Sequence, residues 1–366
     1  MIVPVVNAST PVSEIETPVL LLDAALLESN INKMAEYART QGVFLRPHAK
    51  THKCTVIAHA QLRAGAIGIT CAKISEAEIM GYAGIKDILI ANQVVDPGKI
   101  ERLVSLQNYC DVKVAVDSIK NAEDISLAAH RRGQVVKVII ERDIGMKRCG
   151  TRTLDETLRL AGAVSRLPGL ELAGLMGYEG HTVFLTPRET RLENCSQAIE
   201  ILAETRDAME KAGFSTEIVS SGGTGTYDIT GGYKAVTELQ VGSYATMDWR
   251  YRETGLGFDL ALSVLATVIS RPDRQTAVID VGMKGVTSEF GLPVVKGIEG
   301  AEVVSLSEEH GKLELSADAL NLAVGDRVEL IPSHGCTTFN LYNWVHVCRE
   351  GLLEGVWPVA ARGALY

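Results

Sequence analysis

The chain has no excess of basic residues, no long apolar run and no ordered set of cysteines. Its 36 Lys and Arg residues are outnumbered by 45 Asp and Glu residues, which gives a formal net charge of −9 at pH 7. This charge argues against nucleic acid or an anionic membrane surface as a partner. No apolar run approaches the roughly 20 residues that a membrane-spanning helix needs.

The lack of a signal-peptide pattern and of paired cysteines bears on the cellular location of the protein. The first residues, Met1 to Asn7, lack the cationic start and the long apolar core of a secretory signal peptide. The seven cysteines are odd in number and show no paired CxxC spacing: they are Cys54, Cys71, Cys110, Cys149, Cys195, Cys336 and Cys348. We therefore expect a cytoplasmic protein with reduced thiols.

Helical and strand patterns alternate from about residue 25 to residue 250. After a helical pattern that Asp23 can cap, eight short strand-like runs occur, at residues 43–45, 68–72, 87–91, 112–116, 136–140, 172–177, 217–220 and 240–245. Eight strands alternating with helices are typical of a (β/α)8 barrel. An open doubly wound sheet is the structural alternative, but it usually has fewer strands and a glycine fingerprint after the first, which this chain lacks.

After residue 255 the pattern changes to strands without intervening helices. These runs cover residues 262–269, 276–281, 312–315, 327–331, 343–348 and 352–357. The segment 18–23 precedes the barrel pattern and is a candidate to pair with them. We therefore expect an α/β chain with a TIM-type (β/α)8 barrel over residues 24–252. Residues 1–23 and 253–366 are expected to form a β-rich domain.

The most informative motif follows the first expected strand and reads Arg46-Pro47-His48-Ala49-Lys50-Thr51-His52-Lys53. Burial and neighbouring cations lower the pKa of a lysine and make its amine nucleophilic. Lys50 at such a strand end therefore suggests a Schiff base, and pyridoxal phosphate (PLP) is the commonest cofactor that needs one. Taken alone, the motif is more often a basic surface loop.

Polar groups follow several other expected strands, where a barrel carries its chemistry. The fifth strand leads into Glu141–Gly150, and the sixth leads into Tyr178–His181. The seventh leads into Ser221-Gly222-Gly223-Thr224-Gly225, whose backbone N–H groups would form a cradle for phosphate. Lys50 and this loop would face one another across the barrel mouth, at a distance that suits one PLP molecule.

In the β-rich region, His334 and Cys336 follow an apolar strand. An imidazole and a thiolate two residues apart provide ligands for one zinc ion. The alternative is a packed thiol beside a locally hydrogen-bonded histidine, since free cysteine is usually just buried.

In combination, these motifs resemble the D-threonine aldolase and D-serine dehydratase family of fold-type III PLP enzymes, relatives of alanine racemase. The resemblance rests on His48–Lys53, Arg148-Cys149-Gly150, Ser221–Gly225, Glu238–Tyr244, Pro332–Thr337 and Trp357–Gly363, and it covers nearly the whole chain. It implies a barrel plus a β domain, a homodimer, and a small amino acid as substrate.

The resemblance also implies roles for individual residues. Lys50 matches the lysine that carries PLP, and Arg148 matches the arginine that faces the pyridine nitrogen. The predicted cofactor contacts further include Tyr178, Gly223, Thr224, Gly225 and Tyr244. His181 matches a catalytic or substrate contact. His334 and Cys336 match a divalent metal site, with zinc favoured over manganese or magnesium.

The activity implied is that of a PLP- and metal-dependent lyase on D-3-hydroxy amino acids. Cys336 favours a D-serine dehydratase-like reaction, because aldolases of the family tend to carry Asp at this place. In that reaction Lys50 removes the Cα proton. The alternative is a D-threonine aldolase-type cleavage to glycine and an aldehyde, in which His181 accepts the hydroxyl proton. An amino acid racemase would leave the His–Cys pair unexplained, and a non-catalytic PLP carrier would need no β domain.

Overall fold

The computed structural model describes residues 7–366 and divides into two compact units. The barrel unit consists of residues 33–50, 57–242 and 364–366. The sheet unit consists of residues 7–32, 51–56 and 243–363. Among the described helices, none combines the length and apolarity needed to cross a membrane. The expected domain boundaries, 24–252 for the barrel and 1–23 with 253–366 for the β domain, stay a prediction.

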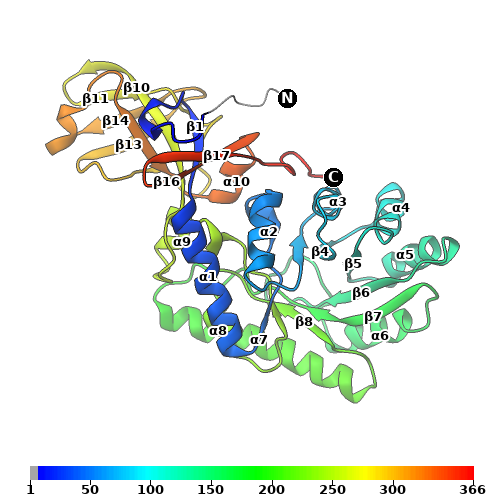
Figure 1. Ribbon diagram of the computed structural model, residues 1–366. Coiled ribbons are helices and arrows are strands. Elements are labelled where there is room, and N and C mark those ends of the chain that lie inside the picture. The colour runs from blue at the N-terminus through cyan, green and yellow to red at the C-terminus, as the bar shows by residue number, and fades with distance from the viewer. Residues whose placement is uncertain (1–6) are drawn as a thin grey trace. The chain divides into compact units, whose positions relative to one another are not determined.

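The barrel unit is built on an 8-stranded, all-parallel sheet (Figure 1). Its strands run in the order β2-β9-β8-β7-β6-β5-β4-β3. Their bounds are β2 Phe44–Leu45, β3 Ile69–Cys71, β4 Asp87–Gln93, β5 Asp111–Val116, β6 Val136–Glu141, β7 Leu170–Met176, β8 Ile218–Ser221 and β9 Glu238–Leu239. Buried side chains from neighbouring strands fill the interior, among them Leu89, Ala115, Ile139, Ala173 and Met176.

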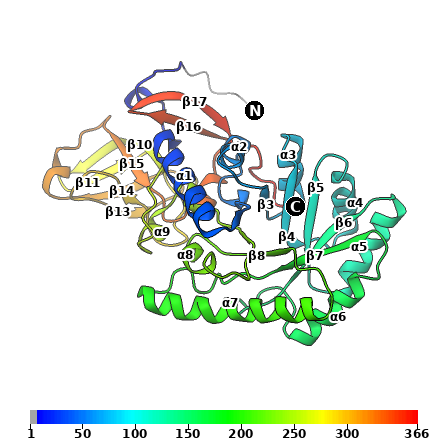
Figure 2. The same cartoon turned by 60° about the horizontal axis from the view of Figure 1, so that its bottom comes forward.

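Helices follow most of these strands, and α4 to α7 lie along the outer side of the sheet (Figure 2). The helices are α2 Thr55–Arg63, α3 Ile74–Tyr82, α4 Pro97–Leu106, α5 Ile119–Arg131, α6 Leu154–Val164, α7 Arg188–Lys211 and the short α8 Tyr227–Thr230; α1 Ala24–Gln41 precedes β2. Local sequence sets their starts. Thr153 and Glu156, for example, form a reciprocal capping box at α6, which satisfies N–H groups that the helix leaves unpaired.

The two edge strands of this sheet are joined by backbone hydrogen bonds. Ile67 N donates to Leu45 O at 2.9 Å, and Thr70 N donates to Pro47 O at 2.8 Å. A parallel bridge pairs His48 with Thr70. The expected (β/α)8 TIM-type architecture is therefore confirmed, and the seam of the barrel runs through the segment that leads to Lys50.

One expected barrel strand is wrong. Residues 240–245 do not form a strand; the eighth strand is Glu238–Leu239, and Ser243–Ala245 form a 3-10 helix, η3. All three residues of η3 are buried, so the apolar pattern there reflects burial and not a strand. The other expected barrel strands are confirmed within a few residues at their ends.

The sheet unit contains a 9-stranded mixed sheet. Its strands are β1 Val19–Asp23, β10 Leu262–Asp273, β11 Thr276–Ile279, β12 Val294–Val295, β13 Ala301–Leu306, β14 Gly311–Leu315, β15 Arg327–Ile331, β16 Trp344–Arg349 and β17 Leu352–Pro358. Short helices accompany them: η1 Val12–Glu14, α9 Trp249–Arg252, η4 Ala317–Asn321 and α10 Gly335–Phe339. As expected, the segment before the barrel joins this sheet, because β1 pairs with both β10 and β16. Strands β12 and β13 were not expected from the sequence.

Candidate active site

Lys50 lies in a 3-10 turn, η2 Ala49–Thr51, directly beyond β2. Its backbone N–H donates to Nδ1 of His48 at 3.4 Å, which helps to close this turn. We expected Lys50 to be buried, and this expectation is wrong, because the Lys50 side chain is exposed. Strand β2 ends at Leu45, and the turn after Pro47 leaves Lys50 exposed while His48 stays buried.

The ring of Tyr178 connects several of the predicted cofactor residues. Lys50 Nζ lies 5.8 Å from the ring centroid, and the guanidinium carbon of Arg148 lies 5.9 Å from it. A Cβ atom added to Gly223 would meet the Tyr178 hydroxyl at 3.0 Å. The loops after β2, β6, β7 and β8 therefore bring Lys50, Arg148, Tyr178 and Gly223 together at one end of the parallel strands, where barrels carry their chemistry.

His181 lies in the same group of loops. It is exposed, and its ring rests on Gly145, where an added Cβ would approach Nε2 to 2.8 Å. Gly145 belongs to the loop that carries Arg148. An imidazole with this exposure is available to exchange a proton with a bound small molecule.

The glycine-rich loop after β8 has the properties of an anion cradle. Gly222 has a φ of +85°, which side-chain-bearing residues rarely adopt, and Gly225 is packed so closely on the Val183 backbone that a Cβ would overlap it. The N–H of Gly225 has no hydrogen-bond partner within residues 7–366. Thr224 is buried within this loop. An unpaired amide in a glycine-rich loop fits the phosphate group of PLP, and the nearby Lys50 and Arg148 fit its ring.

Glu179 is a residue of this region that we did not predict from the sequence. It is fully buried and accepts hydrogen bonds from the glycine-rich loop, including one of 2.6 Å from Thr226 Oγ1. A glutamate directly after a buried strand was the available signal. Glu141, at the end of β6, is a second buried carboxylate; burial raises its pKa, and Gln93 donates to it at 2.6 Å.

Tyr244, His334 and Cys336 lie in the sheet unit. Tyr244 is buried in η3 and packs edge-on against Phe258, with ring centroids 5.8 Å apart. His334 precedes α10, and Cys336 lies in its first turn. The Sγ atom of Cys336 lies 3.5 Å from Oγ1 of Thr51, the residue that follows Lys50 in the sequence.

His334 and Cys336 form an electrostatically coupled pair. Burial lowers the pKa of His334, but the Cys336 sulfur and the Glu289 carboxylate outweigh it and raise that pKa to about 9. Burial raises the pKa of Cys336, but His334 and Thr51 together bring it below its ordinary value. The Nδ1 atom of His334 lies 2.7 Å from Oε2 of Glu289.

This donor set fits a thiophilic divalent ion. Thiolate and imidazole are preferred zinc ligands, and a carboxylate on the second ring nitrogen is the usual support of a metal-bound histidine. In the described part of the chain, no group of three or more His, Cys, Asp or Glu side chains could hold a metal.

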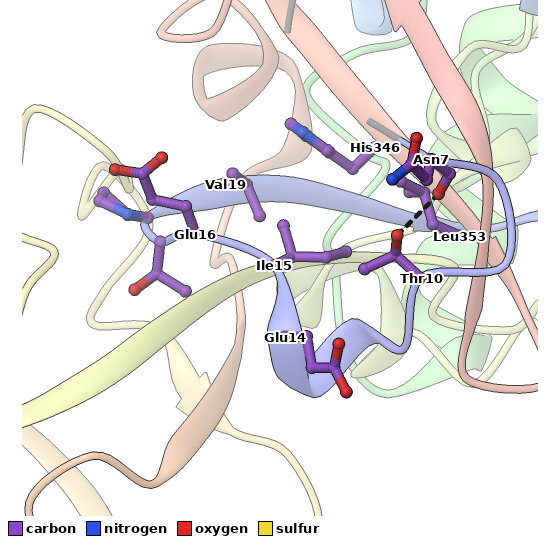
Figure 3. Close-up of a pocket in the computed structure, with 10 residues that line it drawn as sticks. Asn7, Thr10, Glu14, Ile15, Glu16, Val19, His346 and Leu353 are labelled. Atoms are coloured by element: carbon purple, nitrogen blue, oxygen red, sulfur yellow. Dashed lines mark hydrogen bonds between the residues drawn. The ribbon is translucent and has the colours of Figure 1, made fainter. Parts of the chain in front are cut away.

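A cavity of about 550 Å³ lies elsewhere in the sheet unit (Figure 3). It is bordered by the segment before β1 and by β16 and β17, and its lining includes Glu14, Thr17, His346 and Leu353. None of the residues predicted from the sequence lines this cavity.

Known proteins match this chain over nearly its whole length. The alanine racemase N-terminal domain matches residues 22–248, and a putative serine dehydratase domain matches residues 261–348. D-threonine aldolase from an Arthrobacter species is 38% identical over 98% of this chain and 96% of its own length. The crystal structure of D-threonine aldolase from Filomicrobium marinum superposes with a TM-score of 0.96 at 36% identity, covering 99% of this chain and 100% of that one.

A dehydratase is also similar. D-threo-3-hydroxyaspartate dehydratase from a Delftia species is 31% identical over 88% of this chain and 92% of its own length. Its solved structure gives a TM-score of 0.88 at 28% identity, covering 95% of this chain and 98% of that one. The chain therefore belongs to the D-threonine aldolase and D-serine dehydratase family of alanine racemase-like proteins, and it is a PLP-dependent lyase.

Proposed function

We propose that this protein cleaves the Cα–Cβ bond of D-3-hydroxy amino acids and releases glycine and an aldehyde. The observation that carries this proposal is its near full-length similarity to D-threonine aldolase, at 38% identity, against 31% for the dehydratase. The retro-aldol reaction needs a base for the 3-hydroxyl and a proton donor for Cα, and the exposed His181 and Lys50 provide both.

Each residue near Tyr178 has a part in this reaction. In this proposal Lys50 would hold PLP, Arg148 would lie at its pyridine ring, and the 223–225 loop would hold its phosphate. Tyr244, which lies in the sheet unit, is assigned to the phosphate from the family resemblance alone. When bound, PLP supplies an electron sink for the charge that develops at Cα. A ring nitrogen of His181 accepts the proton of the 3-hydroxyl as the Cα–Cβ bond breaks. The Lys50 ammonium group then returns a proton to Cα, which completes glycine and restores the proton balance.

We propose further that His334 and Cys336 hold one divalent ion, zinc rather than manganese or magnesium. The support is the chemistry of the donor pair and the Glu289 carboxylate on Nδ1 of His334. A bound ion supplies a Lewis acid that lowers the pKa of a hydroxyl oxygen. The protein's contribution is to keep the thiolate and the imidazole together and to leave the remaining positions open.

Dehydration is the second candidate, and Cys336 is the observation that favours it. D-threo-3-hydroxyaspartate dehydratase has been solved as a histidine-to-alanine variant and as a metal-free cysteine-to-alanine variant, and the two altered positions are two residues apart, like His334 and Cys336. In this reaction Lys50 removes the Cα proton, hydroxide leaves Cβ, and hydrolysis of the product gives a 2-oxo acid and ammonia. Racemisation would leave the His334 and Cys336 pair without a role.

Product identification separates these candidates. The purified protein would be incubated with D-threonine, D-serine, D-phenylserine and D-3-hydroxyaspartate, with the L-isomers as controls. Glycine and an aldehyde in equal amounts support the proposed cleavage. Equal amounts of 2-oxo acid and ammonia would establish dehydration instead, and the L-isomer as sole product would establish racemisation.

A homodimer and a cytoplasmic location complete the proposal. Both rest on the family resemblance and on the composition of the chain. Sedimentation of the PLP-loaded protein tests the first, and fractionation of the source cells tests the second.

A further inference from the structure

The buried carboxylate of Glu179 is surrounded by donors from the segment after β8. It accepts hydrogen bonds from Ser221 Oγ at 3.0 Å, Thr226 Oγ1 at 2.6 Å and Thr230 Oγ1 at 2.7 Å, and a longer one of 3.4 Å from Gly222 N. Glu179 has no exposed surface, and it forms no ion pair with any residue that the structure describes. A buried carboxylate without a cation is costly, so these donors must offset its lost hydration.

Thr226 links this carboxylate to the cradle. Its hydroxyl donates to Glu179, and the same oxygen accepts the N–H of Gly223 at 3.2 Å. The backbone N–H of Thr226 donates in turn to Gly223 O at 3.1 Å. Because the hydroxyl hydrogen is directed to Glu179, the oxygen lone pairs are left to face Gly223. The Glu179 carboxylate thereby holds the backbone of the glycine-rich loop at Gly223 through the hydroxyl of Thr226.

Thr230 donates to the same carboxylate oxygen, but its hydroxyl forms no hydrogen bond with residues 221–225. The hydroxyl donates to Oε1 of Glu179 and lies 3.6 Å from Sγ of Cys195, and the residue belongs to α8, beyond the glycines. Thr226 and Thr230 are both fully buried. Both threonines donate to Oε1 of Glu179, but only the hydroxyl of Thr226 also accepts the N–H of Gly223.

We infer that Glu179 is a positioning residue that shapes the phosphate cradle through Thr226. The inference rests on the proposed assignment of residues 223–225 as the phosphate site. Glu179 touches neither phosphate nor substrate in this role; it acts by holding the loop so that backbone N–H groups such as that of Gly225 point to the ligand.

The test compares Thr226→Val with Thr230→Val, two substitutions of the same size that each remove one donor to the same oxygen. PLP affinity would be measured by absorbance titration of the apo-protein, and inorganic phosphate binding by its effect on the melting temperature. We expect Thr226→Val to weaken both ligands by about tenfold or more and Thr230→Val to weaken them by less than about threefold, although both variants lose a buried hydrogen bond. Glu179→Gln should resemble Thr226→Val, because an amide cannot accept all four bonds.

Equal losses of affinity in the two valine variants, or unchanged affinity in both Thr226→Val and Glu179→Gln, would overturn this inference alone. Wild-type protein that binds neither PLP nor phosphate would overturn the proposed function and the inference with it. Because the two valine variants are compared with each other, the result does not depend on whether Glu179→Gln folds.

Discussion

The imidazole of His334 is stacked on the ring of Phe290, with ring centroids 4.5 Å apart and planes inclined by 21°. The preceding residue, Glu289, holds Nδ1 of the same imidazole. Phe290 thus fixes the plane of the imidazole ring, and Glu289 fixes which ring nitrogen faces its carboxylate. In the proposed metal site, Nε2 would be the nitrogen that binds the ion.

This arrangement predicts that Glu289→Gln weakens metal binding by about 10- to 100-fold, the usual effect of removing such a carboxylate. Zinc affinity would be measured by competition with a coloured chelator. Glu308→Gln is a matched control in the same unit, since Glu308 is exposed and pairs only with Lys284. Equal zinc affinity in the two variants would show that Glu289 has no such role.

The donor pair itself predicts a change of metal preference. Cys336→Asp should lower the affinity for zinc and favour manganese or magnesium, because carboxylate oxygen suits harder ions than thiolate does. Chelator treatment of the wild type should abolish turnover but preserve the PLP absorbance, and zinc should restore activity. Cys348→Ala, which removes another thiol of the sheet unit, should behave as the wild type. Full turnover in a demonstrably metal-free preparation would contradict the metal site.

Lys50→Ala should lose both the visible absorbance band of bound PLP and all measurable turnover. Borohydride reduction of the wild type, followed by peptide mapping, should find the cofactor on Lys50. Lys53 and Lys73 serve as internal controls, since both lie near Lys50 in the sequence. A label on either of them would refute the assignment.

The buried ion pair of Arg46 and Glu238 predicts a large effect on stability. Both side chains are 2% exposed, and Arg46 Nε lies 2.9 Å from Oε2 of Glu238. Arg46→Met would leave the carboxylate buried without its cation, which costs about 3–5 kcal/mol in comparable pairs. The double variant Arg46→Met/Glu238→Gln should recover part of this loss. Urea unfolding provides the measurement, and a double variant no more stable than the single one would argue against the pair as the cause.

His346 predicts a pH-dependent loss of stability. Burial lowers the pKa of this histidine in β16, so the folded state binds its proton less readily than the unfolded chain does. The stability that neutral His346 contributes is therefore complete above the unfolded-state pKa of about 6.5 and declines as the pH falls from there toward the folded-state value. His346→Gln should reduce the difference in unfolding free energy between pH 7.5 and pH 5.5. An unchanged difference would assign the pH dependence to other groups.

The barrel and the main motifs could be predicted because they depend on local pattern. Strand patterns such as Val136–Glu141 alternate with capped helices. The glycine-rich loop can likewise be recognised from its own residues, without knowledge of its tertiary contacts. The exposure of Lys50 could not be predicted, since it depends on the turn after Pro47. Glu179 was missed because its significance comes from donors more than forty residues later, such as Thr226. β13 was missed because its pairing with β14 depends on tertiary contacts that propensity does not report.

The seam of the barrel has a consequence for how the protein acquires its cofactor. Backbone bonds tie the segment before Lys50 to residues on both sides: Arg46 N donates to Leu239 O, and Thr70 N donates to Pro47 O. The first of these bonds joins residues that are far apart in the sequence, and closing so long a loop costs conformational entropy, which slows folding. A chain in which this closure has not occurred therefore contains Lys50 but not the closed ring of strands that leads to it. In the proposed role of Lys50 as the lysine that carries PLP, such a chain would offer the amine without the strands that hold it in place.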